Sequence, residues 1–274
     1  MKKQAKVYKG RVLIVAGSDS GGGAGIQADI KTVTALGGYA MTAITAITVQ
    51  NTLGVHGIAE IEPAVVTAQM VDCLDDIGAE VVKTGMLHSS AVIEAVLAGL
   101  ERPSAPETLV VDPVMVAKGG TRLAAEETVQ TLRERLIPRA SVITPNLPEA
   151  STLLGRPVTG IDEMDQAAFD LLSLGPKAVL LKGGHLTGTL LRDVLVTADG
   201  LVYFDDPRIE TRSTHGTGCT LASAIATGLA QGMELIPAVR RARAYVRTAL
   251  ATAPGFGAGH GPLNHGHTVR PFSA

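Results

Sequence analysis

Residues 213–220 near the C-terminus contain the residue types expected of an anion site. They include two glycines, several small hydroxyl residues, His215 and Cys219, and they run directly into the apolar, alanine-rich stretch 221–230. That stretch predicts a helix, and the first N–H groups of a helix have no partner inside it and lie at the positive end of the helix dipole. The segment therefore predicts phosphate binding without the lysine of the common phosphate loops.

Cys219 falls in the first turn of this predicted helix. Because a helix N-terminus stabilises a thiolate relative to a thiol, we expect Cys219 to be ionised at neutral pH. The alternative is that Cys219 is a small packing residue.

A second glycine cluster, residues 17–25, contains five glycines in nine residues. Residues 23–28 match the dinucleotide fingerprint G-x-G-x-x-G/A, but the acidic ribose partner expected about 20 residues later is missing. Asp19 and Asp29 would also repel a pyrophosphate. We therefore predict that these glycines bring the backbone close to a flat, uncharged ligand; the alternative is a tight turn without a ligand.

Charged side chains follow several of the predicted strands. Asp112 comes directly after the apolar run 109–111, and Glu149 lies shortly after the run 142–144. Both then lie at the carboxyl edge of the sheet, where open α/β sheets bind ligands, and carboxylates suit Mg²⁺ held through water and substrate phosphate. Glu149 alone could instead stabilise a helix N-terminus. Lys182, at the end of another strand, could reach a nucleotide phosphate or be a simple strand-end charge.

Short β-branched runs alternate with longer alanine-rich segments over most of the chain. The short runs are continuously apolar, as strands covered on both faces are, and the longer segments predict crossover helices. The pattern predicts a three-layer α/β/α sandwich with a mostly parallel central sheet. The predicted strands are 12–16, 43–49, 81–84, 109–111, 142–144 and 179–181, and the predicted helices are 25–36, 63–76, 90–99, 125–136, 147–154 and 162–174.

After Gly184 the pattern changes. Residues 190–197 and 201–204 flank the turn Ala198, Asp199 and Gly200, which is typical of a hairpin rather than a crossover. We predict an antiparallel edge to the sheet.

Length and composition favour one large domain and a small-molecule partner. With 274 residues, 46% hydrophobic and 18% charged, the chain can bury a large core. We predict a flexible N-terminal tail over residues 1–10 and a single domain over 11–274. The net charge of -2, without a dense Lys/Arg cluster, argues against binding of nucleic acid or an anionic membrane.

Cysteine usage and the N-terminal segment predict a cytoplasmic protein. Cys73 and Cys219 are far apart and unlike in context, which argues for a reducing compartment. The apolar run after the basic N-terminus is too short for a signal peptide or a membrane span.

Several motifs, in this order, carry a resemblance that covers about residues 11–267. The chain resembles the hydroxymethylpyrimidine/phosphomethylpyrimidine kinases of thiamine biosynthesis, within the ribokinase-like superfamily that also includes pyridoxal kinases. The motifs are AGSD at 16–19, GGAGIQAD at 22–29, VQNT at 49–52, KTGML at 83–87, DPVM at 112–115, TPNLPEA at 144–150, KGGH at 182–185 and HGTGC at 215–219.

The resemblance implies a site for each ligand. It implies that the pyrimidine contacts the backbone of Gly17, the amide of Gln50 and the side chains of Met86 and Val114. An amide suits this task because it offers a donor and an acceptor to the edge of an aminopyrimidine. It assigns Asp29 to the substrate site as well, as one of three acids near the phosphates.

The remaining implied residues concern the nucleotide and the metal. Asp112 and Glu149 correspond to the acids near Mg²⁺. The catalytic anion hole that receives the phosphoryl group corresponds to Gly216, Thr217, Gly218 and Cys219. The ATP contacts correspond to Asn146, Lys182, Thr214 and His215.

The implied activity is the ATP- and Mg²⁺-dependent phosphorylation of 4-amino-5-hydroxymethyl-2-methylpyrimidine to the monophosphate and then to the diphosphate. A Cys219 thiolate is then a candidate base for the alcohol, whereas a phosphate acceptor needs no base. One alternative is a pyridoxal or pyridoxine kinase, although Gln50 favours the aminopyrimidine. Another is a non-catalytic pyrimidine-binding sensor domain, against which Asp112, Glu149 and Lys182 argue. We also expect a homodimer in which the hairpin at Asp199 covers a neighbouring site.

Two further features have simple structural interpretations. His260, His265 and His267 are interrupted by glycine and proline, which favours a tail folded over the body rather than a metal cluster. Residues 240–243, with three arginines, predict a solvated helix face.

Overall fold

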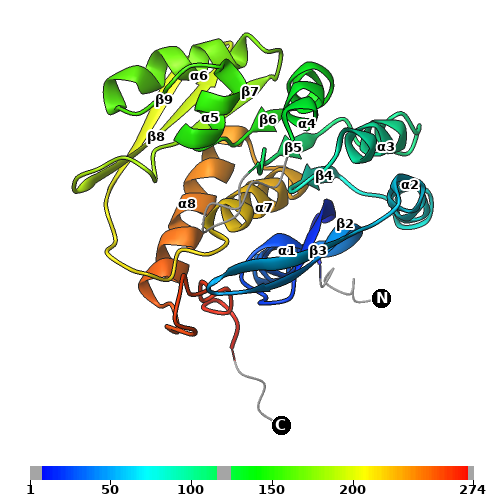
Figure 1. Ribbon diagram of the computed structural model, residues 1–274, viewed down its shortest axis with the longest axis horizontal. Coiled ribbons are helices and arrows are strands. Elements are labelled where there is room, and N and C mark those ends of the chain that lie inside the picture. The colour runs from blue at the N-terminus through cyan, green and yellow to red at the C-terminus, as the bar shows by residue number, and fades with distance from the viewer. Residues whose placement is uncertain (1–7, 116–124, 271–274) are drawn as a thin grey trace, which may run out of the picture.

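One mixed sheet extends across the protein (Figure 1). The structure, a computed structural model, describes residues 8–115 and 125–270. Its nine strands have the order β3-β2-β1-β4-β5-β6-β7-β8-β9. The strands are β1 (Arg11–Asp19), β2 (Tyr39–Asn51), β3 (Gly54–Glu60), β4 (Val81–Thr84), β5 (Leu109–Val111), β6 (Val142–Ile143), β7 (Ala178–Lys182), β8 (Leu190–Thr197) and β9 (Gly200–Pro207).

The strand pairing confirms the predicted mostly parallel sheet. The six strands from β2 through β7 in this order are parallel, whereas β3 on one edge and the β8–β9 hairpin on the other are antiparallel. The carboxyl ends of the parallel strands therefore meet along one edge of the sheet, where ligands bind in folds of this kind.

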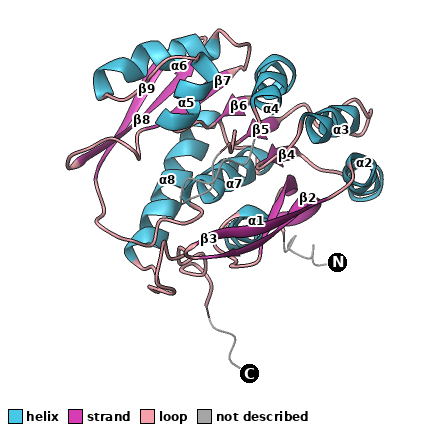
Figure 2. Ribbon diagram, in the orientation of Figure 1, coloured by secondary structure: helices cyan, strands magenta, loops and turns pink. Residues whose placement is uncertain are grey.

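Helices cover both faces of the sheet (Figure 2). Alternate residues of β1 belong to two separate cores, Leu13 and Val15 to one and Val12 and Ile14 to the other, because successive side chains of a strand point to opposite faces. One face carries α1 (Gly25–Ala35), α7 (Thr217–Ala230) and α8 (Leu235–Ala251). The other carries α2 (Pro63–Asp72), α3 (Ser90–Leu100), α4 (Glu126–Thr131), α5 (Leu147–Leu154) and α6 (Met164–Leu172). The predicted α/β/α sandwich is confirmed.

Two predicted helices change geometry before they end. The helix predicted over 63–76 is α2 followed by a π-helical turn at Cys73–Ile77, which ends at Gly78 with φ 75. The helix predicted over 125–136 is α4 followed by a similar turn at Leu132–Leu136.

Strand β3 is the element that sequence patterning missed. It pairs antiparallel with the second half of β2, and the two strands form a ribbon that extends from the sheet. The prediction that residues 43–49 are covered on both faces is wrong for the end of that range, since Ile47 is 47% and Val49 is 63% exposed. Gly54, which begins β3, was the available turn signal.

The prediction of a flexible tail is wrong for residues 8–10, which contact the body of the protein. Residues 1–7 lie outside the described part of the chain, but Lys9 N donates to Gly37 O at 3.0 Å and Tyr39 N donates to Gly10 O at 2.8 Å. The Tyr8 ring packs edge-on against the Tyr39 ring, with centroids 5.7 Å apart. Residues 8–10 are therefore attached to the body of the protein.

Arg243 on α8 corrects the prediction of a fully solvated arginine face. Its side chain is buried and pairs with Asp193 of β8 and, at 2.7 Å, with Asp206 of β9. Burial, together with neighbouring Arg247, lowers the pKa of Arg243 to about 10. The pattern of residue types on α8 could not reveal this contact, because both acids come from the distant hairpin.

Membrane association through a spanning helix finds no support in the described ranges. None of the helices there is both long and apolar enough to cross a membrane.

Candidate active site

Three adjoining cavities lie along the carboxyl edge of the sheet, around the N-terminus of α7. The smallest, about 70 Å³, shares Ala24, Val114 and Cys219 with a middle cavity of about 500 Å³. The middle cavity in turn shares Lys182 and Gly218 with a third cavity of about 230 Å³. Each cavity therefore adjoins the next at shared lining residues.

The small cavity brings together four of the five predicted substrate residues. Gly17, Gln50, Met86 and Val114 all line it, and so does Cys219. Its walls are mostly apolar or backbone, as suits a flat ring. The complete lining is Ala16, Gly17, Ser18, Asp19, Ala24, Gly25, Thr48, Gln50, Val55, Gly85, Met86, Val114 and Cys219. Val55 belongs to β3 and was therefore missed with it.

One side of the Gln50 amide is held by a hydrogen bond, and the other side lies near His215. Thr48 Oγ1 donates to Gln50 Oε1 at 3.0 Å, and Gln50 Nε2 lies 3.4 Å from His215 Nε2. The backbone of Gln50 is fixed too, because its N–H donates to Ser20 Oγ and its carbonyl accepts from the same hydroxyl, both at 2.8 Å. One end of the ribbon is therefore attached to the first glycine cluster.

Asp19 organises that glycine cluster. Its carboxylate accepts hydrogen bonds from the backbone N–H groups of Gly21 at 2.8 Å, Gly23 at 3.0 Å and Ala24 at 2.8 Å, and from His215 Nε2 at 2.8 Å. Burial raises the pKa of Asp19, but the bonds from His215, Ala24 and Gly21 outweigh it and the net shift is downward. The sequence did not reveal this role.

The two glycine clusters pack directly on one another. Gly216 has φ +84, and a Cβ added there would lie 1.8 Å from the carbonyl oxygen of Gly23. A Cβ on Gly23 would likewise lie 2.5 Å from the His215 ring. Only glycine fits this contact, so it fixes the start of α7 against the first cluster.

The first turn of α7 faces the middle cavity. Gly216, Thr217, Gly218 and Cys219 all line it. Their N–H groups stand at the start of a 14-residue helix, where the helix itself supplies no acceptors. The predicted anion loop therefore lines a cavity with its N–H groups at the start of the helix.

Lys182 joins the two predicted metal-binding acids. Its Nζ lies 3.1 Å from Asp112 Oδ1 and 3.9 Å from Glu149 Oε2. Asp112 Oδ1 also accepts from Thr144 Oγ1 at 3.0 Å. Burial tends to lower the pKa of Lys182, but Asp112 and Glu149 outweigh it and raise the value.

Glu149 caps a helix and also faces a cavity. With Asn146 it forms a reciprocal cap at the start of α5, in which Asn146 N donates to Glu149 Oε2 at 2.8 Å and Glu149 N donates to Asn146 Oδ1 at 2.9 Å. It also lines the middle cavity. Burial, reinforced by Asp112, raises its pKa against the opposing effect of Lys182.

Asp112 and Glu149 fit a metal ion that binds only a few protein side chains. Within the described ranges, no group of three or more His, Cys, Asp or Glu side chains is placed to hold a metal. Asp112 and Glu149 supply hard oxygen donors beside the anion loop. This donor set is typical of Mg²⁺ that keeps several waters and phosphate oxygens.

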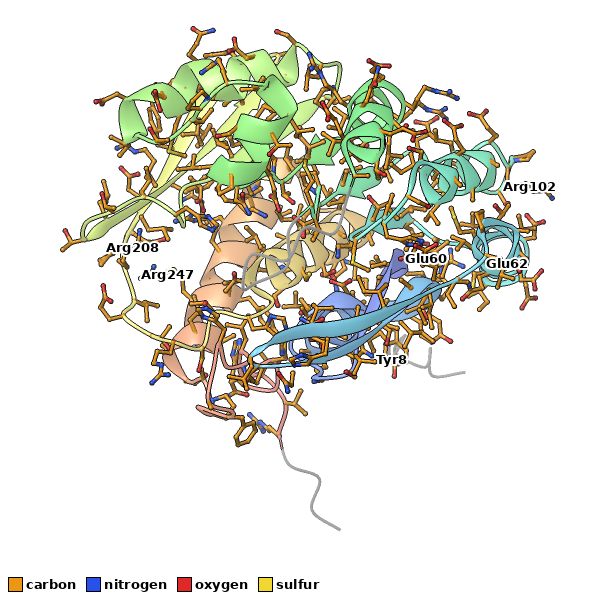
Figure 3. The ribbon with its side chains drawn as sticks, viewed as in Figure 1. Tyr8, Glu60, Glu62, Arg102, Arg208 and Arg247 are labelled. Atoms are coloured by element: carbon orange, nitrogen blue, oxygen red, sulfur yellow. The ribbon has the colours of Figure 1, made fainter. Side chains whose placement is uncertain are left out.

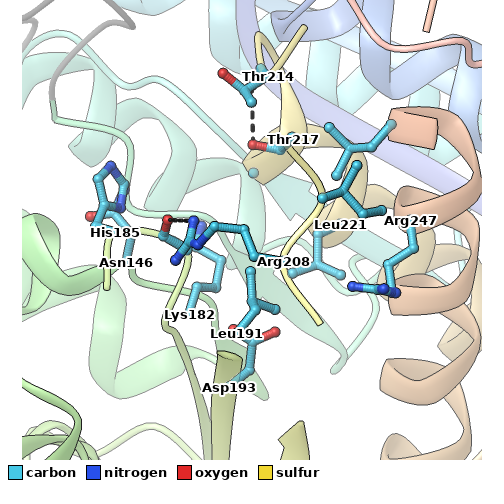
Figure 4. A pocket seen from close by; sticks show the side chains of 14 residues that line it. Asn146, Lys182, His185, Leu191, Asp193, Arg208, Thr214, Thr217, Leu221 and Arg247 are labelled. Atoms are coloured by element: carbon cyan, nitrogen blue, oxygen red, sulfur yellow. Dashed lines mark hydrogen bonds between the residues drawn. The ribbon is translucent and has the colours of Figure 1, made fainter. Parts of the chain in front are cut away.

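The third cavity extends toward the β8–β9 hairpin and α8 (Figure 4). It includes the predicted nucleotide residues Asn146, Lys182 and Thr214, but not His215. His215 lines the middle cavity and bonds to Asp19 instead, so its predicted contact with the nucleotide is not supported by its position.

Arg208 and Arg247 also line the third cavity and were missed (Figures 3 and 4). The Arg208 guanidinium donates to the carbonyl oxygens of Gly184 at 3.2 Å, Leu186 at 2.5 Å and Gly188 at 2.9 Å. Arg208 therefore holds the loop after β7 in place. No local pattern in the sequence indicates this long-range contact.

Asp29 is the predicted substrate residue that the structure places elsewhere. Its side chain is fully buried, and Lys83 Nζ lies 2.9 Å from both of its oxygens while Ser223 Oγ donates at 2.6 Å. It lines none of the three cavities. Asp29 therefore faces the interior from α1 and is bonded to Ser223 of α7, away from the described cavities.

Cys219 corrects the expectation of a thiolate. Burial raises the pKa of its thiol to about 12, and the nearby Asp29 and Asp112 carboxylates add to the effect. Lys83 and the N–H of Gly25 oppose it without reversing it. Burial and the two acids therefore outweigh Lys83 and the Gly25 N–H, and the thiol is neutral near pH 7.

The chain is similar in sequence to proteins of one known family. Residues 19–264 match the family model described as phosphomethylpyrimidine kinase. The hydroxymethylpyrimidine/phosphomethylpyrimidine kinase of Streptomyces coelicolor is 47% identical over 258 residues, covering 93% of this chain and 94% of that protein. The thiamine biosynthesis bifunctional protein of Geobacter sulfurreducens is 50% identical over 96% of this chain, which spans 54% of its length.

A solved structure agrees in fold. The ADP complex of Bacillus subtilis pyridoxal kinase superposes with a TM-score of 0.87 at 37% identity, covering 94% of this chain and 98% of that one. Sequence and fold relationships therefore extend over nearly the whole chain, and the chain belongs to the phosphomethylpyrimidine kinase family.

Proposed function

We propose that the protein uses ATP and Mg²⁺ to phosphorylate 4-amino-5-hydroxymethyl-2-methylpyrimidine and then its monophosphate. The observation that carries this proposal is that Cys219 and Val114 line both the small apolar cavity and the cavity at the anion loop. An acceptor ring in the small cavity would place its hydroxymethyl group at the middle cavity. Relatives named as hydroxymethylpyrimidine/phosphomethylpyrimidine kinases support the choice of acceptor.

Gln50 selects the ring. Thr48 fixes the amide oxygen and leaves the NH₂ group on the side of His215. A fixed amide can pair with both a ring nitrogen and an exocyclic amino group. Met86 and Val114 provide apolar contact for the ring faces.

The start of α7 stabilises the transferring phosphoryl group. Phosphoryl transfer depends mainly on positioning and on stabilisation of charge on the equatorial oxygens. The N–H groups of Gly218 and Cys219 and the ammonium of Lys182 are preorganised for this task beside one cavity.

Asp112 and Glu149 would hold Mg²⁺, which neutralises charge on the phosphates. Lys182 keeps the two carboxylates at a common site when no ion is bound to them. The third cavity, which leads away from the anion loop along Asn146 and Arg208, is the place for the rest of the nucleotide.

Cys219 acts as a neutral thiol close to the acceptor hydroxyl. A thiol with a pKa of about 12 is a poor resting base. A loose transition state needs positioning more than an early proton transfer. Cys219 therefore orients the acceptor, and the second phosphorylation, of an already ionised phosphate, needs no base.

The proposal includes a cytoplasmic homodimer. Exposed apolar side chains gather on the β2–β3 ribbon, namely Ile47, Val49, Leu53 and Ile58, and favour this surface over the turn at Asp199 as the contact between copies. Two free cysteines favour a reducing compartment. Sedimentation of the purified chain tests the dimer.

The decisive experiment offers four acceptors in parallel with Mg-ATP: the pyrimidine alcohol, its monophosphate, pyridoxal and pyridoxine. ADP release is measured as kcat/KM for each. We expect the pyrimidine alcohol and its monophosphate to be preferred. A preference for pyridoxal would replace the proposed acceptor, and ligand binding without ADP release would indicate a sensor domain.

A further inference from the structure

The C-terminal segment carries a histidine whose position the reaction described above does not use. His260 lines the middle cavity, together with the anion loop, Asp112 and Glu149. It comes from a glycine-rich segment far from α7 in the sequence. Its ring is exposed, and among the described residues no side-chain hydrogen bond or ion pair engages it.

The backbone around His260 is held on the side of the ribbon. His260 N donates to Thr52 O at 2.9 Å, and Gly259 N donates to Thr52 Oγ1 at 3.3 Å. A Cβ on Gly259 would lie 2.0 Å from Thr52 O, so the two segments touch at a point where only glycine fits.

The same segment is held on the side of the anion loop. His215 N donates to Gly261 O at 3.1 Å, and a single parallel bridge links His215 with Pro262. His260 is therefore fixed between the ribbon over the acceptor cavity and the residue that precedes the anion loop. Its place does not depend on its own side chain.

Several acidic side chains surround the acceptor and middle cavities, so a second negative group there needs a partner. Asp19 lines the acceptor cavity, and Asp112 and Glu149 line the middle one. Lys182 is already paired with Asp112 and Glu149, and His215 is hydrogen-bonded to Asp19. A phosphorylated acceptor adds a charge of about -1.5 to -2 at this point. The first acceptor, an alcohol, adds none.

We propose that His260 binds the acceptor phosphate in the second phosphorylation and so discriminates the monophosphate from the alcohol. This inference rests on the proposed function. The imidazole donates a hydrogen bond to a phosphate oxygen in the middle cavity, which it lines together with the α7 N-terminus. The alcohol does not reach it, so the first phosphorylation proceeds without His260.

The test compares His260→Ala with the unaltered protein on both acceptors at saturating Mg-ATP, and then varies Mg-ATP at a saturating acceptor concentration. We expect KM for the monophosphate to rise about 10- to 100-fold, the loss expected for a hydrogen bond to a charged group, with KM for the alcohol unchanged. His56→Ala is the matched control, because His56 is exposed on the same ribbon and lines none of the three cavities. It should change neither KM.

Three outcomes would overturn the inference. One is an equal rise in KM for both acceptors, and another is no rise for either. The third is a rise confined to KM for ATP, which would place His260 on the nucleotide. If the unaltered protein phosphorylates neither pyrimidine, the proposed function fails and the inference fails with it, whereas activity on both with an unchanged His260→Ala variant refutes the inference alone.

Discussion

His215 Nε2 lies 2.8 Å from Asp19 Oδ2, which joins residues 196 positions apart in the sequence. Asp19 also holds the backbone of the first glycine cluster, and His215 immediately precedes Gly216 of the second. One carboxylate therefore sets the position of both the acceptor cavity and the anion loop. Acceptor and phosphoryl group meet because these two loops are bonded to each other.

Replacing Gly216 with alanine should disable the anion loop. The added methyl would collide with Gly23 O and strain a residue at φ +84, so we expect kcat/KM to fall about 100-fold, as for a displacement of reacting groups by about 1 Å. Gly232→Ala is the control, since Gly232 has φ +81 at the other end of α7 but nothing within 4 Å of an added Cβ. If both variants lose activity equally, backbone strain rather than the contact with Gly23 is responsible.

Removing the charge of Lys182 should affect both catalysis and the acids beside it. In Lys182→Met, Asp112 and Glu149 lose their shared cation, and transition-state charge loses a preorganised partner. We expect kcat to fall on the order of 100- to 1000-fold in an ADP-release assay. The same change at exposed Lys177 should leave kcat unaltered. Near-normal kcat in Lys182→Met would remove Lys182 from the site.

Arg243 should contribute strongly to stability without contacting ligand. Arg243→Leu leaves Asp193 and Asp206 without their buried partner, which we expect to cost about 3–5 kcal/mol. Thermal unfolding should then shift down by roughly 10 °C. Arg240→Leu, on the exposed face of the same helix, should shift it by no more than about 2 °C. Equal shifts would mean that the ion pairs add nothing specific.

Acid should destabilise the fold through His265. Its Nε2 lies 2.9 Å from Thr220 Oγ1 in α7, and burial lowers its pKa from 6.5 to about 4. Between these values the unfolded chain binds a proton that the folded protein does not. This contribution to stability is therefore complete above pH 6.5 and is lost as pH falls toward 4, with a slope of at most about 1.4 kcal/mol per pH unit.

Urea unfolding between pH 7 and pH 4 measures this slope. His265→Gln, which keeps a hydrogen-bonding group near Thr220, should flatten it. His56→Gln, on the exposed ribbon, should not. An unchanged slope in His265→Gln would assign the acid sensitivity to other groups.

Cys219 should react slowly with alkylating agents at neutral pH. Only the thiolate is nucleophilic, and a pKa of about 12 leaves little of it. In a Cys73→Ser background, the rate of iodoacetamide modification should rise about tenfold per pH unit from pH 7 to pH 10, without a plateau. A rate that is already independent of pH at pH 7 would restore the thiolate expected from the sequence, and a plateau at any pH below 9 would contradict the raised pKa.

Kinetics of Cys219→Ala test whether the Cys219 thiol acts as a base in the first phosphorylation. The sequence hypothesis that this change slows the first phosphorylation more than the second remains a prediction. A neutral thiol orienting the hydroxyl makes the expected difference modest, and Cys219→Ser should retain most of the first-step rate.

Local patterns in the sequence were sufficient for the layers of the fold and for the approximate positions of the parallel strands, although β1 and β2 extend beyond their predicted ranges. Continuous apolar runs marked the buried parallel strands, and Asp112 and Lys182 could be placed because each follows such a run directly. Glycine clusters and the start of an alanine-rich helix marked the two loops. These are properties of neighbouring residues, which a linear pattern records.

Contacts between distant segments decided the rest. Asp29 forms an interior ion pair because Lys83 of β4 lies beside it, and Cys219 stays neutral because burial and two acids outweigh Lys83 and the Gly25 N–H. Strand β3 formed by pairing with β2, and His260 reached the cavity through Thr52. Burial and electrostatic environment depend on which segments pack together, so the sequence determined which residues were present at the site and only the tertiary structure decided their charge, exposure and partners.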